Sequence, residues 1–85
     1  MNTLSTVLDT MITPEQCRMA RAALRLGVRD VARLSGVSAM TISRFENGQS
    51  GGQAETLRRL QAAFEQEGIT FIPANGGGAG VRAKA

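Results

Sequence analysis

The stretch GVSAMTISRFENGQ, residues 36–49, combines a turn glycine, a helix cap and a short helix. Gly36 can take the positive φ that ends one helix, and Ser38 can accept a hydrogen bond from an unpaired N–H at the start of the next. Val37 lies between them and is the apolar residue that fills the space between the two helices. Because so few residues join the helices, the connection is a tight turn, and the stretch predicts a helix-turn-helix pair.

The predicted helix after Ser38 has two sides of different character. Successive helical residues are about 100° apart, so Ile42 and Phe45 point together into a core. The opposite side carries short or polar side chains, which suit the major groove of DNA: Ala39, Met40, Ser43, Arg44 and Asn47.

Each residue of that outer side has a contact that its chemistry favours. Ala39 or Met40 can touch a thymine methyl group, and Ser43 can bond a base edge. Arg44 can bind guanine with two hydrogen bonds or hold a phosphate. Asn47 lies at the far end, where a phosphate contact is more plausible than a base contact. An alternative for Met40 is a partly buried packing role.

Helices are expected on both sides of this pair. Residues 14–25 follow a capping-box pattern formed by Thr13 and Gln16. A helix from residue 28 follows Gly27 and ends at Gly36, and one over residues 53–67 ends at Gly68. The apolar spacing in MNTLSTVLDTMI predicts either a short amphipathic helix or a frayed terminus.

The end of the chain predicts β-structure. ITFI, residues 69–72, is β-branched and aromatic and predicts a short strand. The glycine-rich PANGGGAG predicts a turn or flexible link, and VRAKA a second strand or a basic tail. We therefore divide the chain into an N-terminal extension (1–13), a helix-turn-helix domain (14–67) and a β/glycine-rich extension (68–85).

Composition narrows the function classes. The chain has 85 residues, a formal net charge of +3 and a pI near 10.5, and its positive charge is concentrated in residues 18–44, which favours an acidic partner such as nucleic acid. Cys17 is the sole cysteine and is expected to be a small buried hydrophobe. No apolar run approaches the ~20 residues of a membrane span, and no signal peptide is recognisable, so we expect a cytoplasmic protein.

An enzyme is not expected. The sequence has no histidine, tyrosine or tryptophan, and it shows no cluster of metal ligands and no carboxylate pair with an evident pocket. We therefore expect no metal and no cofactor.

Residues 14–67 resemble the lambda-repressor-like helix-turn-helix domains, the Xre family of bacterial and phage regulators. The resemblance is carried by ARAAL, VRDVARLSGVSAMTISRFENG and TLRRLQAAF. It implies an all-α fold, a compact four- to five-helix bundle, to which this chain adds a short C-terminal β extension. It also implies that the helix after Ser38 is the recognition helix, and that Arg21 and Glu46 form a buried ion pair that braces it.

Together, residue chemistry and resemblance lead us to expect DNA contacts from eight residues: Arg29, Ser38, Ala39, Met40, Thr41, Ser43, Arg44 and Asn47. Two departures from the family pattern matter. Val28 stands where many members carry a glutamine that contacts phosphate, and Arg29 is the candidate to replace it. Ala39 stands where a long polar residue is common, which leaves more of the recognition to Arg44, methyl contacts and DNA shape.

The sequence therefore predicts a transcriptional regulator that binds double-stranded DNA, a repressor acting as a homodimer on a palindromic operator. Three alternatives stay open. The chain could be an antitoxin-like or adaptor protein that binds a protein partner through residues 69–85, a non-specific nucleoid binder, or an unrelated bundle in which the helix pair is only structural.

Overall fold

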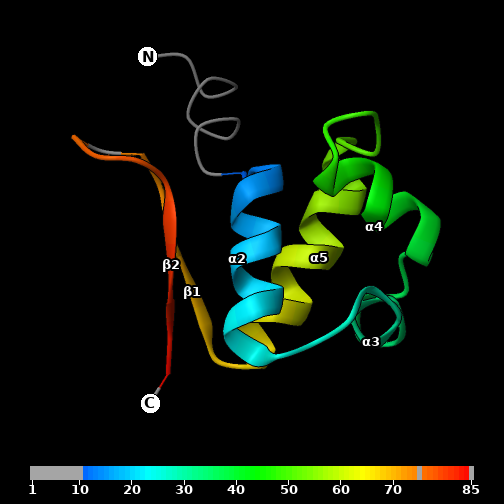
Figure 1. The fold of residues 1–85 in the computed structure, drawn as a ribbon, viewed down its shortest axis with the longest axis horizontal. Coiled ribbons are helices and arrows are strands. Elements are labelled where there is room, and N and C mark those ends of the chain that lie inside the picture. Colours follow the sequence, from blue (N-terminus) through cyan, green and yellow to red (C-terminus); the bar gives the residue numbers. More distant parts are fainter. Residues whose placement is uncertain (1–10, 75, 85) are drawn as a thin grey trace.

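A computed structural model describes residues 11–74 and 76–84. Within these residues the chain forms four helices and two strands (Figure 1), whose bounds are α2 Pro14–Leu24, α3 Val28–Ser35, α4 Ala39–Glu46, α5 Ala54–Gln66, β1 Ile69–Ile72 and β2 Gly80–Ala83. The predicted all-α bundle with a C-terminal β extension is confirmed. The helix expected near the N-terminus falls largely on residues 1–10, which lie outside the described residues. No described helix has the length and apolar character needed to cross a membrane.

Local signals set the helix ends. The hydroxyl of Thr13 accepts a hydrogen bond from the N–H of Gln16 at 3.1 Å, and the Gln16 amide oxygen accepts one from the N–H of Thr13 at 2.9 Å. The predicted capping box is therefore present. Arg25 ends α2 in the left-handed region with a φ of 58°. Gly36 ends α3 with a φ of 76°, and the hydroxyl of Ser38 starts α4 by accepting from the N–H of Thr41 at 3.1 Å.

The core lies where the four helices and the hairpin meet. Val37 is buried in the turn between α3 and α4, and Ile42 and Phe45 point inward from α4, as predicted. Cys17 is fully buried, also as predicted. The buried apolar cluster consists of Ile12, Cys17, Ala20, Val31, Val37, Ile42, Phe45, Leu57, Leu60, Phe64 and Ile69.

The C-terminal extension is an antiparallel hairpin that packs on the helices. Ile69 lies opposite Ala83, and Ile72 lies opposite Gly80. The ring of Phe71 meets Phe64 of α5 edge-to-face, with centroids 6.0 Å apart. The hairpin lies on one side of α2, while α3 and α4 lie on the other (Figure 1). Residues 81–83 thus form the strand alternative rather than a basic tail.

Gly36 provides a test of the turn that joins α3 and α4. An added Cβ would meet nothing closer than 3.8 Å, so the cost of Gly36→Ala comes from the backbone alone. We expect a loss of about 1 kcal/mol in the free energy of unfolding, because an L-residue is strained at positive φ. Gly52 has no positive φ and open space around it, so Gly52→Ala is the matched control. Equal urea midpoints for the two variants would contradict this account of the turn.

Candidate functional site

The outer side of α4 is open to solvent. Met40 is 62% exposed, so its packing alternative is wrong, and Arg44 and Asn47 are also exposed. Ala39 and Ser43 are half-buried on the same helix. The helix and its C-cap therefore present a long apolar, a guanidinium and an amide side chain to solvent, from Met40, Arg44 and Asn47.

The other expected contact residues lie in the first turn of α3 and at the start of α4. Arg29 is exposed in the first turn of α3, and Ser38 is exposed ahead of α4. The Ser38 hydroxyl donates to Oγ1 of Thr41 at 2.8 Å while it caps the helix. The hydroxyl groups of Ser38 and Thr41 thus already make hydrogen bonds at the N-terminus of α4. The structure places none of the eight expected contact residues in the core.

The end of α4 is fixed by backbone hydrogen bonds. Gly48 follows Asn47 with a φ of 73°. The N–H of Gln49 donates to the carbonyl of Arg44 at 2.8 Å, and the N–H of Gly48 donates to that of Phe45 at 3.0 Å. This is the Schellman arrangement, which satisfies the last carbonyls of a helix. The backbone that carries Arg44 is therefore held in place.

A buried cluster joins α2 to the end of α4. Nε and Nη2 of Arg21 donate to the two carboxylate oxygens of Glu46 at 2.8 and 2.7 Å. The thiol of Cys17 donates to Oε2 of Glu46 at 3.3 Å, and Arg18 donates to the backbone carbonyl of Glu46. The Glu46 side chain is only 6% exposed, against 25% for Arg21. The structure thus brings Arg21 and Glu46 together as the resemblance implies.

The cluster shifts the acidity of its members. Burial, reinforced by the neighbouring Glu46 carboxylate, raises the pKa of the Cys17 thiol to about 12, although the nearby charges of Arg21 and Arg18 oppose the shift. Burial alone would also raise the pKa of Glu46. The hydrogen bonds from Arg21 and Cys17 and the positive charges of Arg21 and Arg18 outweigh it, so the pKa of Glu46 is lowered. At neutral pH the cluster therefore holds a thiol, a carboxylate and two guanidinium groups.

Sequence reasoning missed two members of this cluster. It took Cys17 as packing alone, and it counted Arg18 only as part of the basic stretch over residues 18–44. The signal available was spacing, because residues 17, 18 and 21 share one side of a helix. Arg21, the expected partner of Glu46, lies on that side of α2, so its helical neighbours could also be expected near Glu46.

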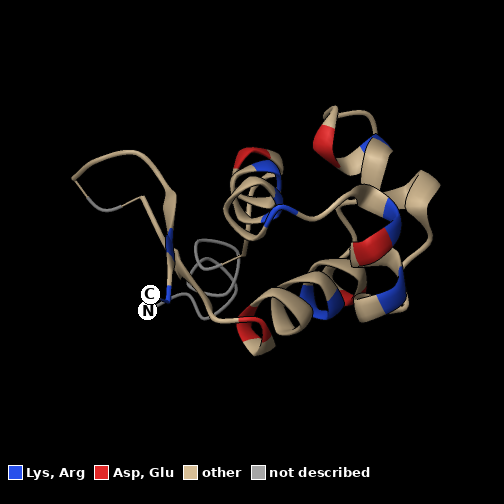
Figure 2. Ribbon diagram, turned by 60° about the horizontal axis from the view of Figure 1, so that its bottom comes forward, with Lys and Arg blue, Asp and Glu red and all other residues tan. Residues whose placement is uncertain are grey.

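Basic residues occur on all four described helices and on β2 (Figure 2). Several are paired locally: Arg33 with Asp30, and Arg58 and Arg59 with Glu55. Within the described part of the chain, no ion pair is found for Arg25, Arg29, Arg44, Arg82 or Lys84. Of these residues, Arg29 and Arg44 lie on the helix pair α3–α4 and are the candidates there for an external anion.

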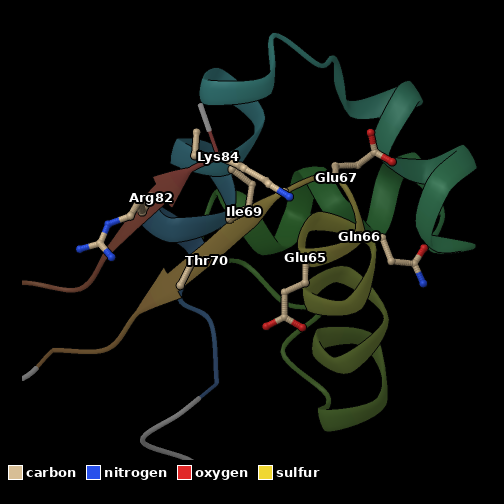
Figure 3. A pocket seen from close by; sticks show the side chains of 9 residues that line it. Glu65, Gln66, Glu67, Ile69, Thr70, Arg82 and Lys84 are labelled. Carbon is tan, nitrogen blue, oxygen red and sulfur yellow. The ribbon is translucent and has the colours of Figure 1, made fainter.

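One pocket lies away from α4, between the end of α5 and the hairpin. It is an open groove of about 730 Å³. Figure 3 shows Glu65 and Glu67 on one side and Arg82 and Lys84 on the other. Its lining is mixed in charge and open to solvent, unlike an enclosed apolar ligand site. In residues 11–74 and 76–84, no group of three potential ligands is placed to hold a metal ion.

The Arg21–Glu46 pair can be tested by a double-mutant cycle. Arg21→Met leaves the Glu46 carboxylate buried without its main partner, and we expect a loss of about 3–5 kcal/mol in the free energy of unfolding. Adding Glu46→Leu removes the stranded charge, so the double variant should regain at least about half of that loss. Urea unfolding of the four proteins measures the coupling. A double variant no more stable than Arg21→Met would contradict a buried ion pair.

The pH dependence of stability gives a second test. Because folding lowers the pKa of Glu46, its contribution is present above the ordinary glutamate pKa of about 4.3 and is lost as pH falls toward the folded value. The exposed Asp30 and Glu55, whose pKa values are also lowered, are kept in both proteins. Below pH ~4.3 the wild type should therefore lose stability more steeply than the Arg21→Met, Glu46→Leu variant. Parallel curves from urea unfolding would show that Glu46 adds no such dependence.

Comparison with known proteins agrees with this geometry. Residues 15–68 match a family model described as a helix-turn-helix domain. The HTH-type transcriptional regulator TreR of Salmonella typhimurium (strain LT2) is 44% identical over 46 residues, and so is the TreR of Escherichia coli (strain K12). Each match covers 54% of this chain and 15% of the relative. Because the family model spans more than half of the sequence, the chain belongs to the helix-turn-helix domain family.

Proposed function

We propose that the chain is a sequence-specific transcriptional regulator that binds double-stranded DNA by laying α4 in the major groove. The observation that carries this proposal is the outer side of α4, which is open to solvent and free of acidic side chains while both helix ends are fixed. The two relatives named transcriptional regulators support it.

Residues of α4 divide into base and phosphate contacts. Arg44 reads guanine through two hydrogen bonds, and Ser43 bonds a neighbouring base edge. Met40 and Ala39 touch thymine methyl groups. Asn47 binds phosphate at the end of the helix. With few hydrogen-bonding side chains on α4, the shape and flexibility of the operator contribute to specificity.

The start of α3 supplies a phosphate contact. Val28 offers no polar side chain there, and Arg29 is exposed without an ion pair among the described residues. Arg29 therefore binds the backbone beside the groove that α4 enters. Ser38 and Thr41 are close to the duplex at the start of α4, where the Ser38 hydroxyl also caps the helix by accepting from the N–H of Thr41 and donates to the Thr41 hydroxyl.

We further propose that the protein is a repressor that acts as a homodimer on a palindromic operator. One short helix makes few base contacts, and a second copy doubles them. Two recognition helices then enter successive major grooves about 34 Å apart. The hairpin is the candidate joining surface, because it lies across α2 from α4 and stays accessible while α4 is on DNA (Figure 1). Repression follows by occlusion of the promoter.

The same accessibility favours a second candidate function, an adaptor that binds a protein partner through residues 69–85. Co-purification of the full chain distinguishes the two. A stoichiometric partner that is lost on truncation after Gly68 would favour the adaptor. In either case we propose a non-enzymatic cytoplasmic protein without a cofactor.

Selection of bound fragments from a random double-stranded DNA library tests the proposed function directly. A regulator yields one enriched motif, and a homodimer yields two inverted copies of it at fixed spacing. Footprinting on the enriched fragment then gives a discrete protected site. Uniform protection and no enriched motif would indicate a non-specific nucleoid binder and overturn the proposal.

Arg44 gives the most specific prediction from this interface. Arg44→Ala should weaken binding to the selected operator by about 1–3 kcal/mol and relax the preference at one base pair. Arg58→Ala removes the same charge from a side chain that is paired with Glu55 on α5, and serves as the control. Titration against the operator and its single-base variants measures both effects. Equal weakening on every sequence would show that Arg44 binds only phosphate.

A further inference from the structure

Gln16 connects α2 to both strands of the hairpin. Its side chain is buried at the first turn of α2, with the residue 2% exposed. The amide nitrogen donates to the carbonyl oxygens of Ile72 and Gly80, at 3.0 Å each. These two residues face one another across the hairpin at its loop end. One side chain therefore binds both strands at the same point.

The hairpin is thus held by two kinds of contact. Ile69 is buried at the α5 end, and Phe71, one residue before Ile72, packs on Phe64. Figure 3 shows Ile69 at the point where the strand leaves α5. Apolar contacts are non-directional, so they attach the hairpin without setting its angle. Among the described residues, Gln16 supplies the side-chain hydrogen bonds that join the hairpin to the helices, and it does so at the other end.

The same helix holds the recognition helix. The residues directly after Gln16 include Cys17, Arg18 and Arg21, and all three bond to Glu46 at the end of α4. Hairpin and α4 lie on opposite sides of α2 (Figure 1). One helix, α2, therefore makes side-chain hydrogen bonds both to the hairpin and to α4.

We propose that Gln16 is a positioning residue that fixes the angle of the hairpin relative to α4, and thereby sets the half-site spacing that the homodimer accepts. The inference rests on the proposed function in one respect, that two copies join through their hairpins. The fixing of the hairpin itself is independent of DNA. The two parts are measured separately.

Two substitutions separate the hairpin contact from the helix cap. Gln16→Glu keeps an oxygen to accept from the N–H of Thr13, but it loses both donors and places a negative charge beside two carbonyl oxygens. Gln16→Met keeps the length without donors or charge, and it is the variant to use if Gln16→Glu does not fold. Gln66→Glu makes the same chemical change at an exposed position of α5 and is the control.

Hydrogen exchange on the full chain tests the fixing of the hairpin. Loss of two buried hydrogen bonds should speed amide exchange in residues 69–72 and 80–83 by about tenfold or more in both Gln16 variants. Gln66→Glu should leave it unchanged. Unchanged exchange in a folded Gln16 variant would overturn the proposal, because another contact must then fix the hairpin.

Binding to the selected operator, with one or two base pairs inserted between its half-sites, tests the spacing. The wild type and Gln66→Glu should lose about tenfold or more in affinity per misplaced half-site, as expected when a rigid dimer cannot span both. The Gln16 variants should lose about threefold or less, with unchanged affinity for a single half-site. Faster exchange with full spacing discrimination would overturn the spacing part. A wild type that selects no paired half-sites would refute the proposed homodimer, and with it the spacing role, while exchange still decides whether Gln16 fixes the hairpin.

Discussion

The carboxylate of Glu46 lies inside the protein, and the rest of the site depends on how it is held. A helix of eight residues such as α4 has little stability of its own, because forming the first turn costs more than so few hydrogen bonds return. The protein fixes it from outside. Ser38 and Thr41 hold its start, while Arg21, Arg18 and Cys17 of α2 hold its end through Glu46.

This arrangement has a consequence for recognition. The groups that fix α4 bind its ends or its inner side, and the side chains of Met40 and Arg44 are exposed. Substitution of Met40 or Arg44 should therefore cost little stability. The hairpin is attached on the far side of α2, where it does not compete with α4 for a ligand. The contacts that fold the domain and the surface that we propose for DNA recognition are thus largely separate.

Local signals in the sequence predicted most of the fold, because Gly36 and Ser38 act on their immediate neighbours. Side-chain contacts between residues far apart in the sequence could not be predicted from such local signals. The amide of Gln16 was recognisable as half of a capping box, but its two other partners lie 56 and 64 residues further along the chain. Arginine is usually exposed to solvent, so the sequence gives Arg18 no partner. Its partner, the backbone carbonyl of Glu46, comes close only because α4 packs beside α2 in the fold. The pairing of Arg21 with Glu46 was predicted from the family resemblance. The positions of charged residues in the sequence do not show which acidic residue pairs with Arg21.

We propose that α4 meets DNA with its outer side. Titration of the isotopically labelled full chain with its selected operator tests this through the changes in backbone amide chemical shifts. We expect the largest changes at Arg29 and over residues 38–47, with smaller ones in the hairpin. Changes confined to residues 69–83, with α4 unaffected at saturation, would contradict the proposal.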